Sequence, residues 1–264
     1  MDNTVTIANL VRVNGRDFSG TDWIQLRNIG GNNTLNNVAL LAGGADYGIQ
    51  SDAGTLTIGA ISGETGNRDL YVSGAGNVTI PNWDARRDIV MDGTGTLTIA
   101  GNTSHTGATL VNSGTLLING NSTGTGLVEV RAGSAIGGSG SLAGDLTLLA
   151  GARFVFDPLT TLNVTGDVTL DDTFGVASLV NADGSAIDWS SITDGIYTIV
   201  GTTASTFNNI SNFGDTAAFD IGGGRSAYFQ NGSLELVVVP EPATYALIGG
   251  LLALGAVLIR RRMK

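Results

Sequence analysis

The stretch Trp83-Asp84-Ala85-Arg86-Arg87-Asp88 brings an indole ring, two carboxylates and two guanidinium groups together. A sugar ring could stack on Trp83 while the charged side chains beside it bind hydroxyl groups. Two carboxylates that face one cleft are also what glycoside hydrolysis requires. The alternative is a solvated loop, in which an exposed Asp–Arg pair contributes little stability. We favour the loop and keep the following as candidate sugar contacts only: Trp83, Asp84, Arg86, Arg87 and Asp88.

Other side chains give little support for catalysis. His105 is the only histidine, so every histidine-based triad depends on it. It stands in a polar run with no preceding carboxylate nearer than Asp92, which favours an exposed histidine in a turn. Because Lys264 is the only lysine, a lyase would have to use arginine as its base. We therefore assign no catalytic residue and expect no enzymatic activity.

Metal and cofactor sites find equally little support. The chain has no cysteine, which excludes disulfides and thiolate metal sites, and its single histidine excludes a histidine-rich zinc site. Gly30-Gly31-Asn32-Asn33-Thr34-Leu35 is similar to the calcium-binding Gly-Gly-x-Gly-x-Asp repeat, but the aspartate and one glycine are missing. The oxygen-rich composition is compatible with structural calcium, yet no site can be assigned. We assign no cofactor and no metal.

Charge is distributed unevenly along the chain. The last five residues contain four of the thirteen basic residues: Arg260, Arg261, Arg262 and Lys264. Residues 1–242, the body, contain the other nine, all arginine, together with all 23 carboxylates, for a net charge of −14. Such a field repels nucleic acid and anionic lipid surfaces. Nucleic acid is therefore excluded as a partner.

A repeated pattern of short strands must position these groups. Similar segments begin at glycines that step by 19, 19, 19 and 18 residues, namely Gly76, Gly95, Gly114, Gly133 and Gly151. Within residues 95–99, leucine and isoleucine point one way and the threonines the other, as in a half-buried strand. Strands and corners repeated every ~20 residues are typical of a β-solenoid, whose coils bury their apolar faces against each other. A β-sandwich also has short strands and frequent turns, but regular steps argue against it.

One copy departs from the repeat. At Gly151 the step shortens, and Arg153 takes a position that is apolar in the preceding copies. We expect a small bulge or a change of coil there.

Residues 92–120, DGTGTLTIAGNTSHTGATLVNSGTLLING, resemble the autotransporter-associated β-strand repeat of exported passenger domains. The resemblance is carried by the GTLTI strand, the polar turn before Thr106-Gly107, and the Thr-Leu-Val and Gly-Thr-Leu strands, with His105 replacing the usual aromatic residue. Residues 132–157 are similar to the usual continuation. The resemblance covers residues 90–170 well and 1–89 loosely, and it implies a right-handed parallel β-helix.

Three segments are expected in an otherwise all-β chain. Residues 1–170 form the solenoid repeats. Residues 171–239 lose the spacing, concentrate aromatic side chains, and are expected to form a β-rich cap that protects the open end of the solenoid from edge pairing. Residues 240–264 form a tail.

The tail has the composition of a membrane-spanning helix. Residues 243–259 carry no charge, and as a helix these 17 residues would span roughly 25 Å, near the lower limit for a hydrocarbon core of ~30 Å. The basic flank, Arg260 to Lys264, stays on the cytoplasmic side. We therefore expect a single transmembrane helix in the inner membrane with the body outside; the alternative is a buried C-terminal helix. Because residues 1–25 contain no signal peptide, we expect the true start to lie upstream of Met1.

The order of features in the tail resembles the PEP-CTERM sorting signal of Gram-negative and related bacteria. Pro240, Glu241 and Pro242 form the motif, the apolar run follows, and the arginines end it. The resemblance implies export, transient membrane anchoring, and processing near the motif by the membrane enzyme exosortase. It also implies association with exopolysaccharide or biofilm matrix at the cell surface.

The sequence thus predicts an exported, non-catalytic protein of the cell surface or extracellular matrix. Its partners would be exosortase and extracellular polysaccharide or matrix proteins. Two alternatives remain open. One is a polysaccharide lyase or glycosidase on the same β-helix, and the other is a surface adhesin or self-assembling protein.

Overall fold

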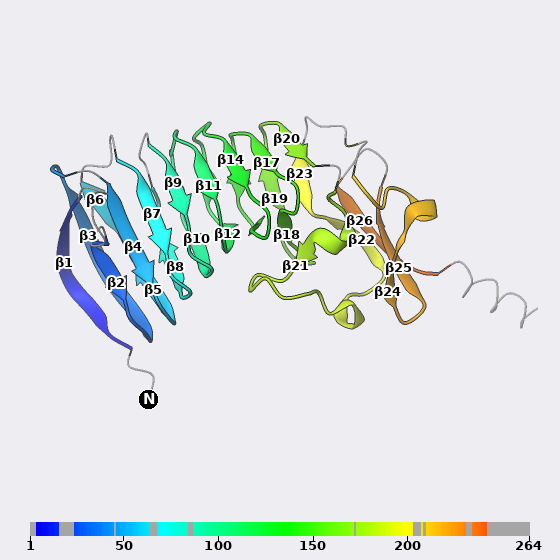
Figure 1. Cartoon of the computed structure of the whole chain (residues 1–264), viewed down its shortest axis with the longest axis horizontal. Coiled ribbons are helices and arrows are strands. Elements are labelled where there is room, and N and C mark those ends of the chain that lie inside the picture. The colour runs from blue at the N-terminus through cyan, green and yellow to red at the C-terminus, as the bar shows by residue number, and fades with distance from the viewer. Residues whose placement is uncertain are drawn as a thin grey trace, which may run out of the picture.

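The structure is a computed structural model that describes residues 4–15, 24–44, 46–63, 68–83, 87–171, 173–202, 207, 210–230 and 234–241. Short strands stack in coils along the long axis, from β1 at one end to a small antiparallel sheet at the other (Figure 1). The described residues form an all-β parallel solenoid of about seven turns. Helix in this part of the chain is limited to three 3₁₀ turns: η1 (Val176–Ser178), η2 (Trp189–Ser191) and η3 (Asp215–Ala217).

Three parallel sheets build the solenoid, and each gains a strand from successive coils. The first sheet contains β1 (Thr6–Asn14), β3 (Asn32–Leu41), β5 (Thr55–Ile58), β8 (Asn77–Ile80), β10 (Thr96–Ile99), β12 (Thr115–Ile118), β15 (Ala135–Gly137), β18 (Arg153–Val155) and β21 (Leu179–Val180), with β6 (Ile61–Gly63) beside β3. The second contains β2 (Leu26–Asn28), β4 (Tyr47–Ser51), β7 (Leu70–Ser73), β9 (Ile89–Met91), β11 (Thr109–Val111), β14 (Val128–Val130), β17 (Leu146–Leu148) and β20 (Val168–Leu170). The third contains β13 (Asn121–Ser122), β16 (Ser141–Leu142), β19 (Leu162–Val164) and β23 (Val200–Thr202).

The core is a set of apolar columns between the sheets. One column runs in register through the first sheet and consists of Leu56, Val78, Leu97, Leu116, Ile136, Phe154 and Leu179. All seven side chains are buried. Full burial of such a side chain contributes roughly 1.5–3 kcal/mol. The predicted alternation is confirmed, because the threonines of β10 lie on the opposite face from Leu97 and Ile99.

Glycine at the coil corners is required by the close stacking of backbones. A Cβ at Gly95 would lie 2.0 Å from the carbonyl oxygen of Gly76, one coil earlier. A Cβ at Gly114 would lie 2.3 Å from the carbonyl oxygen of Gly95, and Gly114 also has a φ of 76°. No larger residue fits these positions without moving a neighbouring coil.

The irregular step lies one coil earlier than predicted. Thr115 pairs with Ala135, so the coil between them has one residue more than the glycine steps indicate. The extra residue is Ser134, whose amide donates to the carbonyl of Arg131 in a tight turn. Arg153 simply pairs with Ala135 on the outer face, so the prediction of a bulge at Gly151 is corrected.

Residues 171–239 combine solenoid and cap. Strands β21 and β23 of this segment pair with β18 and β19, so the parallel coils continue to Thr202. The rest includes an antiparallel sheet in the order β22 (Gly195–Thr198), β26 (Glu235–Pro240), β25 (Arg225–Phe229) and β24 (Phe219–Gly222). Phe229 packs beside Phe174 of the last coil, with ring centroids 5.9 Å apart. The antiparallel sheet therefore lies at the C-terminal end of the solenoid, where the cap was expected (Figure 1).

Within the described residues, no helix is long and apolar enough to span a membrane. The predicted helix at 243–259 lies outside these residues and stays a prediction.

Candidate functional site

The outer face of the first sheet carries two columns of uncharged polar side chains. They point away from the core on four successive coils, in strands β3, β5, β8 and β10. We call the set the hydroxyl face: Asn32, Thr34, Asn77, Thr55, Thr57, Thr79, Thr96 and Thr98. All eight side chains are half-buried or exposed.

The same outer face becomes apolar in later coils. Thr98 pairs with Leu117, and Val155 and Val180 continue this side of the sheet. Val155 and Val180 form a small buried cluster with Ala135, against which Leu117 packs.

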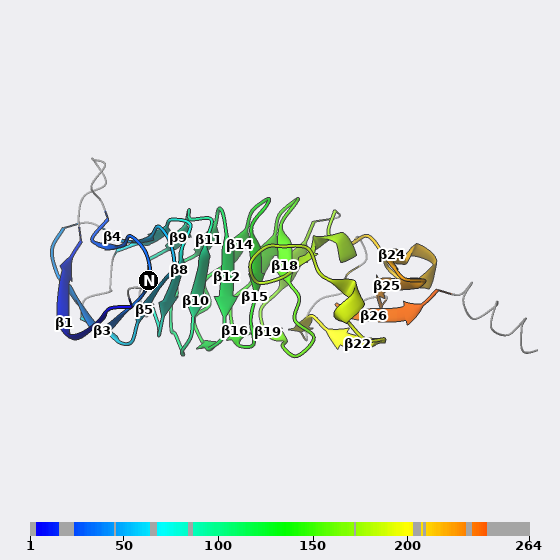
Figure 2. The ribbon, with the colours of Figure 1, turned by 90° about the horizontal axis from the view of Figure 1, so that it is seen from below.

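The cover over these residues is the flap, which we define as residues 181–192 between β21 and β22. It begins as a tight turn in which Val180 and Ala186 form an antiparallel bridge. Figure 2 shows it lying over β15 and β18. The apolar part of the outer face therefore lies beneath the flap, and the hydroxyl face lies beside it.

Two hollows border the flap. The first, of about 490 Å³, lies where Ala182 and Asp183 at the tip of the flap meet Thr96 and Thr98 of the hydroxyl face. The second, of about 520 Å³, lies on the other side of the flap and is lined by Leu117, Val155, Asp157, Ile187 and Asp188, among others.

The carboxylates at these hollows act as turn caps. Asp157 accepts a hydrogen bond from the amide of Leu159 at 2.9 Å. Hydrogen bonds from the side chain and amide of Ser190 lower the pKa of Asp188, and those from Ser185 lower the pKa of Asp183 in the same way. A general acid needs a raised pKa, so the lowered values argue against that role for Asp183 and Asp188.

The predicted sugar site is not assembled at Trp83. Its side chain is 1% exposed and packs edge-on against Tyr47, with ring centroids 6.1 Å apart. Because Trp83 belongs to the core, the prediction that a sugar stacks on it is wrong. Arg87 is exposed, whereas Asp88 accepts a hydrogen bond from the amide of Ala108 at 2.8 Å. Asp84 and Arg86 lie outside the described residues.

His105 is buried rather than exposed, which corrects the prediction for its turn. It is 6% exposed, and its Nε2 lies 3.3 Å from the carbonyl oxygen of Ala108. The turn stacks on the corner of the preceding coil, where Thr103 hydrogen-bonds the backbone of Trp83. Within the described residues, no three His, Asp or Glu side chains are placed to hold a metal ion.

A ladder of aspartates was missed by the sequence analysis. In five coils an aspartate directly precedes the strand of the second sheet, namely Asp46, Asp69, Asp88, Asp145 and Asp167. The Oδ1 atom of one aspartate accepts the amide of the residue one coil later, as in Asp46 to Asp69 at 2.9 Å and Asp69 to Asp88 at 3.1 Å. Partial burial, with the nearby charges of Asp46 and Asp88, raises the pKa of Asp69. The signal in the sequence is an aspartate at a fixed offset before each apolar strand.

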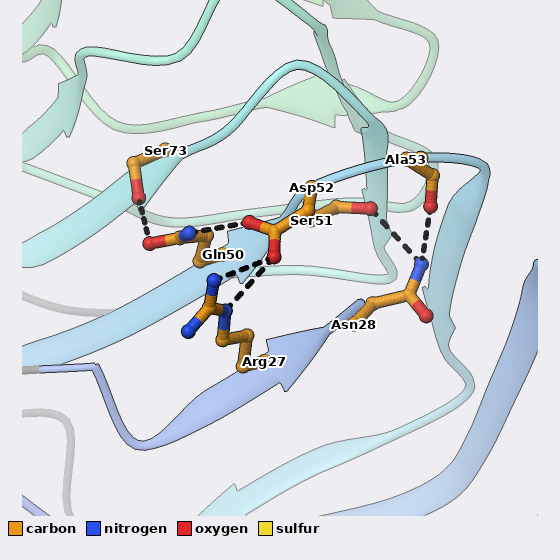
Figure 3. Close-up of polar contacts among 7 residues, drawn as sticks. All are labelled: Arg27, Asn28, Gln50, Ser51, Asp52, Ala53 and Ser73. Atoms are coloured by element: carbon orange, nitrogen blue, oxygen red, sulfur yellow. Dashed lines mark hydrogen bonds and ion pairs between the residues drawn. The ribbon is translucent and has the colours of Figure 1, made fainter. Parts of the chain in front are cut away.

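A second polar cluster joins the first coils (Figure 3). Arg27 pairs with Asp52 at 2.8 Å, and hydrogen bonds from Gln50 and Arg27 lower the pKa of Asp52. The buried Asn28 donates to the hydroxyl of Ser51 and to the carbonyl of Ala53, both at 3.0 Å. These groups hydrogen-bond one another across coils, as expected for a structural corner.

The predicted sorting motif begins inside the cap. Strand β26 lies between β22 and β25, and its last residue, Pro240, pairs with Arg225. The amide of Glu241 donates to the carbonyl of Gly224 at 2.9 Å. Pro242 and the basic flank, Arg260 to Lys264, lie outside the described residues.

Comparison with known proteins assigns the tail. Residues 238–262 match the family model of the PEP-CTERM protein-sorting motif. The match includes the three motif residues and Arg260 to Arg262, as the sequence predicts. No curated protein and no solved structure matches the chain. The resemblance to the autotransporter-associated repeat and the right-handed sense of the helix stay predictions.

Proposed function

We propose that this chain, whose C-terminus carries a PEP-CTERM protein-sorting motif, is a non-catalytic structural protein of the cell surface or extracellular matrix. Exosortase recognises the motif after export, while residues 243–259 and the basic flank hold the chain transiently in the inner membrane. The solenoid then serves as a rigid spacer associated with exopolysaccharide.

The junction between body and signal is the observation that carries the proposal. The backbone is hydrogen-bonded into the cap sheet through Glu241, and Val238 is fully buried. The matched signal therefore starts in the last strand of a folded body, with no linker between them. A cut that leaves the cap intact must fall after Glu241, since removal of β26 would separate β22 from β25.

Intact-mass measurement and terminal peptide mapping of protein from its native cells test this proposal. We expect a mature C-terminus just after Glu241 in envelope or extracellular fractions, and an intact Lys264 in cells that lack exosortase. Glu241→Ala should retain the tail, whereas the matched control Glu235→Ala, on the same strand, should be processed normally. Cytoplasmic protein with Lys264 intact in wild-type cells would overturn the proposal.

A polysaccharide lyase or glycosidase is less well supported. The carboxylates at the hollows cap turns, and the pKa of Asp188 is lowered rather than raised. Release of reducing ends or unsaturated sugars from polysaccharide by the purified chain would favour the enzyme instead.

One observation favours the self-assembling alternative. Strand β1 pairs with β3 along one edge, and no described strand pairs with its other edge. Val5, Ile7 and Leu10 beside this edge are 52%, 42% and 49% exposed. Open edges invite pairing with another chain. Light scattering across a concentration series would reveal assembly, and a constant monomer mass would exclude it.

A further inference from the structure

The hydroxyl face differs chemically from the rest of the outer surface of the first sheet. Its two columns, Asn32–Thr55–Asn77–Thr96 and Thr34–Thr57–Thr79–Thr98, contain hydroxyl and amide groups on four successive coils. Neighbouring strands lie about 4.8 Å apart, and alternate residues along a strand lie about 6.7 Å apart. The face is thus a regular grid of hydrogen-bonding groups.

The boundary of the grid coincides with the edge of the flap. Beyond Thr98 the column continues with Leu117, which packs against the apolar cluster around Val155 and Val180. Apolar side chains occur where the flap covers the sheet, and polar side chains occur where the described residues leave it open. The hollow of about 490 Å³ at this boundary is lined by both the grid and the tip of the flap.

The grid is held rigidly by the coils beneath it. The side-chain oxygen of Asn32 accepts the amide of Thr55 at 3.1 Å, and that of Asn77 accepts the amide of Thr96 at 3.0 Å. Threonine in a strand has a restricted χ1 angle. A ligand would therefore meet preorganised groups, and little side-chain entropy would be lost on binding.

Charge selects the chemistry of the ligand. None of the eight side chains is charged, while the body has a net charge of −14. A polyanion would be repelled by the body and would find no cation on the grid. A neutral polymer rich in hydroxyl groups has donors and acceptors to match the grid and meets no electrostatic barrier.

We propose that the hydroxyl face binds a neutral polysaccharide chain laid along the solenoid axis, with its end at the flap. This inference builds on the proposed surface function and names its ligand class and its binding face. Because the described face has no aromatic side chain to stack on a sugar, each contact is weak and affinity accumulates over successive coils. Long chains therefore bind and short oligosaccharides do not.

Co-sedimentation of the purified full chain in mild detergent tests this proposal. The probes are regenerated cellulose and insoluble starch as neutral polymers, with soluble hexasaccharides as competitors. Binding of alginate, a soluble polyanion, is followed by affinity electrophoresis. The variant Thr57→Val/Thr79→Val/Thr98→Val removes three hydroxyls and keeps β-branched side chains of similar volume. The matched control, Thr147→Val/Thr169→Val, makes the same change on the outer face of the second sheet, where these residues are also paired.

The full chain should bind at least one neutral polymer and not alginate, and hexasaccharides should not compete. The triple variant should bind about tenfold more weakly, because each lost hydrogen bond has a modest net effect, and the control should bind like the wild type. Equal binding by the triple variant would overturn the face assignment while glycan association stands. Binding of alginate alone would overturn the ligand class. If the wild type binds no polymer, this inference fails, whereas export and sorting are judged separately by the terminal mapping.

Discussion

At the scale of single residues, Asp69 shows how a side chain that looks suited to chemistry serves the backbone instead. Its carboxylate accepts the amide of Asp88 on the next coil, and Asp46 makes the same contact to Asp69. The repeated contact satisfies amides at coil corners that the sheets leave unpaired. Its cost is the repulsion between carboxylates stacked along one edge of the solenoid.

The raised pKa of Asp69 predicts a pH dependence. The folded state binds the proton of Asp69 more tightly than the unfolded state, so the ionised carboxylate destabilises the fold at neutral pH and is relieved as pH falls through the raised pKa. Asp69→Asn keeps an oxygen for the amide of Asp88 and removes the charge. Thermal unfolding at pH 7 should show an equal or higher Tm than in the wild type, and the difference should shrink in acid.

Asp52 supplies the opposite case as a control. Hydrogen bonds from Gln50 and Arg27 lower its pKa, so its contribution is present at neutral pH and is lost as pH falls through that lowered pKa. Asp52→Asn should therefore lower the Tm at pH 7 and have less effect in acid. A loss of Tm at pH 7 in Asp69→Asn as large as that in Asp52→Asn would contradict the assignment.

Trp83 belongs to the folding core, and its variants should affect stability first. Trp83→Ala should cost about 3–5 kcal/mol in urea unfolding, as for other buried large aromatic residues. Trp83→Phe should cost much less, because it keeps a ring and removes an Nε1 that has no hydrogen-bond partner among the described residues. The exposed Arg87→Ala should change stability by no more than about 0.5 kcal/mol. Similar stabilities for Trp83→Ala and Arg87→Ala would refute the core assignment.

The sequence could not reveal the environment of Trp83 or His105. Both stand among polar residues, and local composition indicated solvent for each. Their burial depends on the corner of a neighbouring coil, through contacts such as that between Thr103 and Trp83. These contacts join residues about one coil apart, so only the coil register reveals them.

At the scale of elements, the period of two and the step of 19 residues were sufficient to predict the coils. Inward Leu97 and outward Thr98 follow from alternation alone, and the register of β10 on β12 follows from the glycine step. The flap was not predictable, because residues 181–192 have no repeat to align. The continuation of the coils into β23 was missed for the same reason.

The glycine columns predict a steep dependence on side-chain size. A Cβ at Gly126 would lie 1.8 Å from the carbonyl oxygen of Gly107 on the preceding coil. Gly126→Ala must therefore force coils apart and should cost about 1–3 kcal/mol in urea unfolding. Gly30→Ala is the matched control, because a Cβ at Gly30 would have nothing within 4 Å. Equal stabilities would show that the corners are looser than described.

At the scale of the whole molecule, the solenoid behaves as a stack in which each coil contacts only its neighbours. Central coils have partners on both sides, whereas β1 has a described partner only in β3. Stability in such arrays is approximately a sum over coils and interfaces. Local opening should therefore be easiest at the β1 end.

Hydrogen exchange followed by mass spectrometry measures this gradient. We expect the slowest exchange in peptides that cover β10, β11 and β12, and exchange that is faster by at least about tenfold in β1. Gly126→Ala should accelerate exchange mainly in the coils that contact it. Uniform protection along the chain would show a single cooperative unit instead.

The direction of β26 has a mechanical consequence. In Figure 2 this strand points along the long axis toward Glu241, whereas the strands of the solenoid run across that axis. Tension applied at Glu241 would pull β26 lengthwise between β22 and β25, loading their hydrogen bonds together in shear. The same tension applied to a solenoid strand would peel its bonds one after another. The chain thus leaves the body through the strand best oriented to resist a pull from the membrane.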